Sequence, residues 1–221
     1  MSQLRERRGA AVLLHGFLRT GASMLPMAVA LRRAGYQVTR CPTFLYQNRT
    51  LPDAARELAL EISALQELHG HVDLVTHSFG GLLARAVMSH APVRRAVLLA
   101  PPNQGAHMAE LARRFVPVHK LGWDPLAQIL PGIPRKLPRG PSEIGIITGG
   151  TGSERGFNPL LDGDNDQTVR VSEARLEGVD HFVVVPVRHT FLMAHREVQR
   201  LTLGFLRDGA FPTSELSLPE R

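Results

Sequence analysis

The chain has 221 residues, of which 43% are hydrophobic and 21% are charged. This length allows one substantial hydrophobic core and is short for two, so we expect a single domain over residues 1–221. The net charge of +6 would suit nucleic acid, but only 5% of the residues are aromatic and the arginine pairs are scattered. Because base stacking needs aromatic side chains, we expect no nucleic-acid partner.

The first forty residues and the cysteine content bear on the compartment. The single cysteine, Cys41, excludes an intrachain disulfide and gives no sign of an oxidising environment. The apolar run near the N-terminus ends at His15, which is too soon for the core of a signal peptide. No stretch approaches the length of a membrane span. We therefore expect a soluble, cytoplasmic protein, and because the ten histidines show no zinc spacing, we expect no metal and no cofactor.

Short apolar runs alternate with helical patterns along most of the chain. The strand candidates are 11–14, 37–41, 72–75, 96–100, 144–148 and 182–187. The helical stretches are 22–34, 52–68, 81–90 and 191–206. Continuous apolar strands separated by helices are typical of a buried parallel sheet. The sequence therefore predicts an α/β fold of about six parallel strands with helices on both faces.

The segment from Thr76 to Gly81 joins the third apolar run to a helical stretch. It reads Thr-His-Ser-Phe-Gly-Gly and places Ser78 between small residues. A strained strand-to-helix turn of this kind lifts a nucleophilic serine above a sheet, and glycine is commoner than threonine at the position of Thr76. The alternative is that Ser78 only caps the helix that follows.

Other candidate groups follow the ends of three further strands. His15-Gly16-Phe17 follows the first strand, the acidic loop 162–169 follows the fifth, and His189 follows the sixth. Because ligands bind beyond the carboxyl ends of parallel strands, these groups are expected to meet near Ser78. A serine becomes a good nucleophile when an imidazole takes its proton and a carboxylate orients that imidazole. The chain order Ser78, Asp166, His189 suits such a triad.

Alternatives remain for two of these roles. As a base, His189 competes with His181, at the wrong end of the last strand, and with His195, inside the following helix. As the acid, Asp166 competes with other aspartates on its loop, Asp164 first among them. Aspartates on loops also cap their own backbone, which is the non-catalytic interpretation of this segment.

In its serine turn and candidate triad, the sequence resembles the α/β-hydrolase superfamily, and more narrowly its small bacterial lipase and esterase-like serine hydrolases. The matching motifs besides the turn from Thr76 to Gly81 are His15-Gly16-Phe17, the loops 100–105 and 186–189, and the acid loop Asp164-Asn165-Asp166-Gln167-Thr168-Val169. The resemblance spans residues from about 10 to 206. The family's acid loop usually has glycine where this chain has Gln167.

The resemblance implies a trimmed α/β-hydrolase sheet of about six strands and a Ser78, His189, Asp166 triad. It also implies an oxyanion hole formed by the backbone amides of Phe17 and Phe79. The expected activity is cleavage of carboxylic acyl esters through an acyl-enzyme, on a small-molecule or lipid ester. Acyl transfer by the same triad, or a catalytically silent binding protein of this fold, are the alternatives.

One proline-rich segment, 103–140, interrupts the alternation of strands and helices. A connection of this length usually carries function or its own small structure, and the pattern predicts a short helix at 106–115 and a turn near 125–130. Its basic residues Arg135, Lys136 and Arg139 and its apolar residues predict a cap with a basic rim. Such a cap would receive an acyl chain and allow transient contact with an anionic lipid surface. The alternative is an insert that merely packs on the sheet.

Overall fold

A computed structural model describes residues 8–40, 50–115 and 125–213 of the chain. Six strands form one sheet in the order β2-β1-β3-β4-β5-β6, and all five neighbouring pairs are parallel. The strands are β1 (Arg8–Leu14), β2 (Tyr36–Arg40), β3 (Val72–His77), β4 (Arg95–Leu99), β5 (Glu143–Gly149) and β6 (Phe182–Val185). The predicted six-stranded parallel sheet is confirmed.

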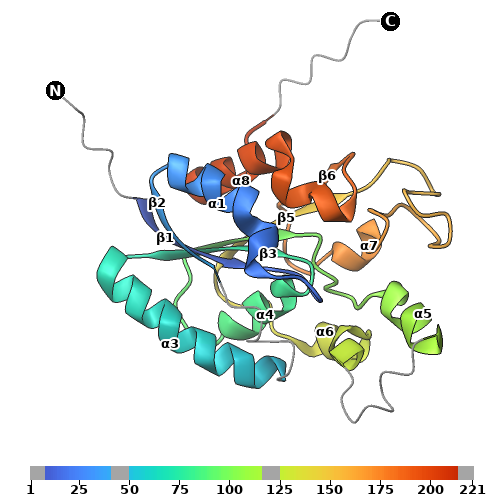
Figure 1. The fold of residues 1–221 in the computed structure, drawn as a ribbon, viewed down its shortest axis with the longest axis horizontal. Coiled ribbons are helices and arrows are strands. Elements are labelled where there is room, and N and C mark those ends of the chain that lie inside the picture. Colours follow the sequence, from blue (N-terminus) through green and yellow to red (C-terminus); the bar gives the residue numbers. More distant parts are fainter. Residues whose placement is uncertain (1–7, 41–49, 116–124, 214–221) are drawn as a thin grey trace, which may run out of the picture.

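Helices cover both faces of this sheet (Figure 1). One face carries α1 (Leu25–Arg33) and α8 (Arg196–Asp208), and the other carries α3 (Leu51–His69) and α4 (Gly80–Val87). Successive residues of a strand point to opposite faces. In β1, Val12 therefore packs in the core beneath α3 and α4, whereas Leu13 packs in the core beneath α1 and α8. The sheet is buried on both sides, which explains its continuous apolar strands.

Two predicted helices are divided at their first turns. The stretch 22–34 begins with a 3-10 segment, η1 (Gly21–Met24), before α1, and the stretch 191–206 begins with η4 (His189–Ala194) before α8. His195 joins η4 to α8 with extended dihedral angles of −75° and 128°. The apolar spacing continues through both junctions, so the pattern of the sequence does not reveal them.

The insert between β4 and β5 contains the expected helix and turn. They are α5 (His107–Phe115) and η3 (Pro125–Ile129), and a further short helix, α6 (Gly132–Lys136), was not predicted. Residues 116–124, with the tryptophan and a lysine of the expected cap, lie outside the described residues. A second unpredicted short helix, α7 (Val171–Ala174), follows the acid loop.

Arg85, on α4, joins the two ends of the insert. Its side chain is 2% exposed, and its guanidinium donates hydrogen bonds to the Asn103 side chain at 3.2 Å and to the backbone carbonyls of Leu137 and Pro138. Burial lowers the pKa of Arg85 to about 10. The carbonyl oxygens replace the water that this cation loses, because a buried charge without such partners is costly.

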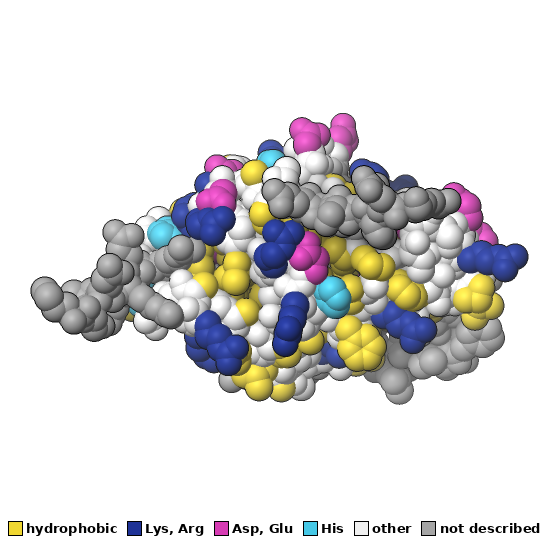
Figure 2. Space-filling model, turned by 90° about the horizontal axis from the view of Figure 1, so that it is seen from above, with side chains coloured by type: hydrophobic (Ala, Val, Ile, Leu, Met, Phe, Trp, Pro, Cys, Tyr) yellow, Lys and Arg dark blue, Asp and Glu magenta, His cyan; other side chains and the backbone are white. Residues whose placement is uncertain are grey.

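On the face seen from above, basic side chains are spread among apolar ones and form no single basic patch (Figure 2). Scattered charges of this kind are typical of a solvated surface. Within the described ranges, no helix has both the length and the apolar character needed to cross a membrane.

Candidate active site

Ser78 occupies the turn between β3 and α4. Its φ of 54° lies in the left-handed region, which is costly for a residue with a side chain and is often found at functional sites. The Ser78 amide donates to the Leu99 carbonyl of β4 at 2.8 Å, so the turn is fixed to the sheet. A Cβ atom on Gly80 would lie 2.6 Å from the Leu14 carbonyl oxygen. Glycine at position 80 therefore lets α4 approach the sheet closely.

Thr76 stands where glycine is commoner in this turn. The residue is fully buried at the end of β3, and its hydroxyl has no hydrogen-bond partner within the described part of the chain. The close contact on this side is instead made by Gly81, where a Cβ atom would lie 2.7 Å from Pro101 Cβ. The positions of this turn at which an added Cβ atom would clash are thus Gly80 and Gly81, the glycines that follow Ser78. This agrees with a threonine at position 76.

His189 and Asp166 are brought together at the same edge of the sheet. His189 Nδ1 donates to Asp166 Oδ2 at 2.6 Å, and both side chains are buried. Asp166 Oδ1 accepts the backbone amides of Thr168 at 3.0 Å and Val169 at 2.8 Å. These hydrogen bonds fix the carboxylate, which in turn orients the imidazole.

The other aspartates of the acid loop have different partners. Asp164 accepts the backbone amides of Thr151 at 2.7 Å and Gly152 at 2.9 Å, and Asp162 is exposed. Asp164 therefore caps the loop that follows β5, which is the turn chemistry expected of a loop aspartate.

Asn165, between the two aspartates, is a supporting residue that the sequence analysis did not identify. It is fully buried, and its Oδ1 accepts the amides of Asn158 and Gln167. Its Nδ2 donates to backbone carbonyls, including that of Gly163 at 2.9 Å. The Asp-Asn-Asp pattern was visible in the sequence, but the inward direction of the asparagine could be seen only in the fold.

The competing histidines lie elsewhere. His181 packs against the rings of Phe205 and Phe211, with centroid distances of 5.3 and 6.3 Å, at the amino end of β6. His195 sits at the junction of η4 and α8. Neither is hydrogen-bonded to Asp166 in the described structure, so His189 is the histidine that the fold pairs with this carboxylate.

The segment after β1 packs directly on the serine turn. A Cβ atom on Gly16 would lie 3.1 Å from Ser78 Cβ, so the backbone of this segment passes close to the serine. His15 is buried and its Nδ1 donates to the Gly16 carbonyl at 2.8 Å, while burial lowers the pKa of His15. The rings of Phe17 and Phe79 have centroids 6.2 Å apart. The two residues expected to form the oxyanion hole are therefore neighbours beside Ser78.

A cavity of about 480 Å³ opens above these residues. Ser78, His189 and Phe17 line it, and Val169 of the acid loop adds to its largely apolar wall. The insert contributes much of the remaining apolar lining through Ala106, Met108, Ala109, Ala112, Leu126 and Ile129, and Leu18 and Pro102 add to it. A volume of this size, with few polar groups converging on one point, is typical of a small-molecule binding site.

In the described structure, Arg135, Lys136 and Arg139, which were expected at a basic rim, do not line this cavity. Arg139 lines a hollow at the amino ends of the strands, and Arg135 lines another on the far side of α5; neither lines the cavity that contains Ser78. The cation that lines this cavity within the described residues is Arg19, whose Nη2 donates to Thr190 Oγ1 at 3.0 Å. The sequence analysis did not single out Arg19, because only the fold shows which basic residues reach the serine.

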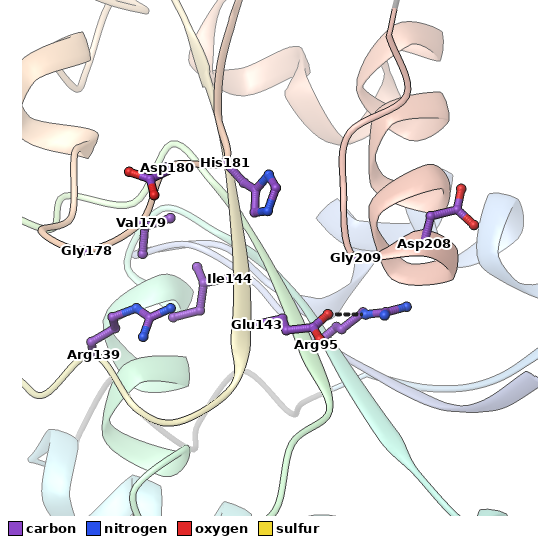
Figure 3. Close-up of a pocket in the computed structure, with 10 residues that line it drawn as sticks. All are labelled: Arg95, Arg139, Glu143, Ile144, Gly178, Val179, Asp180, His181, Asp208 and Gly209. Atoms are coloured by element: carbon purple, nitrogen blue, oxygen red, sulfur yellow. Dashed lines mark hydrogen bonds and ion pairs between the residues drawn. The ribbon is translucent and has the colours of Figure 1, made fainter.

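The hollow that Arg139 lines differs in chemistry as well as in place (Figure 3). It has a volume of about 400 Å³ and a polar lining, and the ion pair between Arg95 and Glu143, at 2.6 Å, lies within it. No serine or cysteine lines it. Because ligands of parallel sheets bind at the carboxyl ends of the strands, the cavity at Ser78 is the candidate active site.

The sequence model of the Alpha/beta hydrolase family matches residues 11–207. The chain belongs to the α/β-hydrolase family. No curated protein matches the sequence. In the described part of this α/β-hydrolase, no group of three or more His, Cys, Asp and Glu side chains could hold a metal ion.

Several solved structures share this fold. The mature lipase BlEst2 of Bacillus licheniformis is 18% identical, with a TM-score of 0.72 over 91% of this chain and 93% of that chain. A structure of the metagenome-derived lipolytic enzymes LipS and LipT is 16% identical, with a TM-score of 0.64 and coverages of 90% and 94%. The metagenomic carboxyl esterase MGS0156 is 16% identical, with a TM-score of 0.61 and coverages of 85% and 66%. At these identities the likeness shows the α/β-hydrolase fold alone.

Proposed function

We propose that this α/β-hydrolase cleaves carboxylic esters through an acyl-enzyme, with Ser78 as nucleophile, His189 as general base and Asp166 as the acid that orients the base. The observation that carries the proposal is the His189 Nδ1 to Asp166 Oδ2 hydrogen bond of 2.6 Å, beside a cavity that both His189 and Ser78 line. Serine, imidazole and buried carboxylate are the three groups that this chemistry requires.

The first half of the reaction forms the acyl-enzyme. Ser78 Oγ attacks the ester carbonyl carbon while His189 Nε2 takes the hydroxyl proton, and Asp166 stabilises the resulting imidazolium. The carbonyl oxygen becomes an oxyanion, which the backbone N–H groups of Phe17 and Phe79 receive. The C–O bond to the alcohol then breaks, and His189 gives its proton to the departing alkoxide.

The second half of the reaction releases the acid. His189 takes a proton from a water molecule, the resulting hydroxide attacks the acyl carbon, and the bond to Ser78 Oγ breaks as His189 returns the proton to the serine. An alcohol in place of water would give acyl transfer, so the product mixture in the presence of added alcohol separates hydrolysis from transfer.

The insert 103–140 acts in this proposal as a cap that supplies the acyl side of the cavity. Ala109 and Ala112 on α5 and Ile129 on η3 support this role because they form part of its wall. An apolar wall favours an acyl chain over a polar one, because burial removes apolar surface from water. The lipase and esterase names of the structural neighbours agree with this substrate class.

The test is a screen of p-nitrophenyl esters of increasing chain length, with Ser78→Ala as the matched variant. We expect turnover by the natural chain and its loss in the variant at unchanged melting temperature. We also expect a fluorophosphonate probe to label Ser78 covalently. Natural protein that is folded but neither labelled nor active would overturn the proposal and favour a binding protein of this fold.

A further inference from the structure

His77 is the last residue of β3 and directly precedes Ser78, the proposed nucleophile. It also contacts His189, the proposed base. Its side chain is 1% exposed. Its Nε2 donates a hydrogen bond to the backbone carbonyl of His189 at 3.1 Å. The two imidazole rings also touch, with centroids 4.5 Å apart and planes inclined by 50°. His77 therefore binds the backbone carbonyl of His189, whereas Asp166 binds the His189 amide and ring.

The other ring nitrogen of His77 faces the segment after β1. A Cβ atom on Gly16 would lie 2.9 Å from His77 Nδ1. This buried nitrogen has no hydrogen-bond partner in the described structure. Because a carbonyl oxygen can only accept a hydrogen bond, the proton of a neutral His77 must be on Nε2, and Nδ1 is unprotonated. The hydrogen bond to His189 thus fixes the tautomer.

The surroundings of His77 keep its ring uncharged. Burial lowers the pKa of His77 well below 6.5, and the charges of His189 and Arg19, and more weakly His15, lower this pKa further. The hydrogen bond to the His189 carbonyl acts in the opposite direction, but its effect is smaller than that of burial. No carboxylate is among the groups that act on it. A neutral ring in this place adds no positive charge against the imidazolium that His189 becomes during catalysis.

We propose that His77 is a positioning residue, which fixes the His189 imidazole for catalysis by holding the His189 carbonyl through its Nε2–H. The inference rests on the proposed function. His189 begins the short 3-10 segment η4, and its amide N–H and ring are already held by Asp166, at 2.8 and 2.6 Å. With the hydrogen bond from His77, the backbone of His189 is fixed on both sides of its α-carbon.

Loss of this support is expected to slow the chemical step rather than weaken substrate binding. The His77 side chain is 1% exposed, and much of the apolar lining of the cavity comes from the insert. A displacement of a catalytic group by about 1 Å can cost about 100-fold in rate. We therefore expect a large fall in kcat at nearly constant KM.

The test uses two variants of similar length. His77→Gln keeps an N–H donor at the reach of Nε2, whereas His77→Met removes it and keeps most of the buried volume. Both are measured with p-nitrophenyl butyrate, and kcat is obtained by dividing the maximal rate by the concentration of active sites that a fluorophosphonate probe titrates. We expect kcat of the Met variant to fall about 10- to 100-fold with little change in KM, and the Gln variant to recover most of the loss.

The results that would overturn the inference are distinct from those that overturn the proposed function. An active natural chain with a Met variant of unchanged kcat would show that the hydrogen bond positions nothing. Equal losses in both variants would assign the effect to the imidazole ring itself and also reject the hydrogen bond. If the Met variant does not fold, His77→Asn replaces it, because its amide is too short to reach the His189 carbonyl. An inactive natural chain rejects the ester hydrolysis instead.

Discussion

His189 and Asp166 are joined by two hydrogen bonds, one between their side chains and one between their backbones. The imidazole Nδ1 donates to the carboxylate at 2.6 Å, and the His189 amide donates to the Asp166 carbonyl at 2.8 Å. The backbone bond holds the acid loop against the start of η4 whatever the charge on the side chains. The orientation of the imidazole therefore has a component that survives replacement of the carboxylate.

This arrangement predicts a partial loss of activity in Asp166→Asn. The amide keeps the size and the backbone contacts of Asp166 but no longer stabilises the imidazolium, so we expect kcat to fall by about 10² to 10⁴. Asp164→Asn is the control, because the Asp164 carboxylate accepts hydrogen bonds from the loop after β5, namely from the amides of Thr151 and Gly152 and from the Thr151 hydroxyl. It should keep kcat and lower only the melting temperature. A greater loss of kcat in the Asp164 variant would show that Asp166 is not the acid.

Gln167→Gly is expected to stabilise the fold. Gln167 is exposed and has a φ of 96°, a conformation that glycine adopts without strain. Relief of this strain stabilises the fold by about 1–2 kcal/mol. Glycine also gives the unfolded chain more conformational freedom, which offsets part of this gain in stability. We expect a gain of up to about 1 kcal/mol in the free energy of unfolding by urea. Asp162→Gly, on the same loop but without a positive φ, should destabilise, and a loss in both variants would contradict the prediction.

Ala109→Phe is expected to shorten the preferred acyl chain. Ala109 is 5% exposed and forms part of the cavity wall, so a larger side chain would fill the space of the distal methylenes. We expect kcat/KM for p-nitrophenyl decanoate to fall at least about 10-fold and that for the acetate to change little. Glu110→Phe is the control, since Glu110 lines the hollow on the other side of α5. A similar fall in kcat/KM with both esters would show that Ala109 does not lie at the acyl-binding part of the cavity.

Two buried imidazoles predict a fold that is sensitive to acid. Burial lowers the pKa values of His15 and His77 below 6.5, so the unfolded chain binds protons there that the folded chain does not. Their contribution to stability is complete above pH 6.5 and is lost as the pH falls from 6.5 toward the folded values. Each imidazole adds at most about 1.4 kcal/mol per pH unit to the slope.

Urea unfolding at pH 7.5 and pH 5.5 measures this effect. The natural chain should lose more stability on acidification than His77→Gln, because glutamine does not titrate. An equal loss of stability in the two proteins would mean that His77 is protonated in the folded state or that other groups cause the loss of stability at acid pH.

The strands and the motifs that carry the candidate triad could be predicted because each is a local feature of the sequence. The β3 strand is buried at all six positions, and its apolar residues Val72, Leu74 and Val75 lead directly to the serine turn. The contacts of Arg19 and His77 could not be predicted, because each depends on a partner that is distant in the sequence. The partners of Asn165 are close in the sequence, but only the folded loop shows that its side chain points inward. The position of Arg135 could not be predicted for the same reason: it is close in the chain to residues that line the cavity, but it lines a different hollow.

The attachment of the insert to α4 has a consequence for engineering. Because one guanidinium, that of Arg85, binds Asn103 at one end and Leu137 and Pro138 at the other, the chain between these anchors begins and ends at fixed points. A library for substrate range can therefore vary positions of the insert that line the cavity, such as Met108 and Ala112, while Arg85 keeps the two ends of the insert in place.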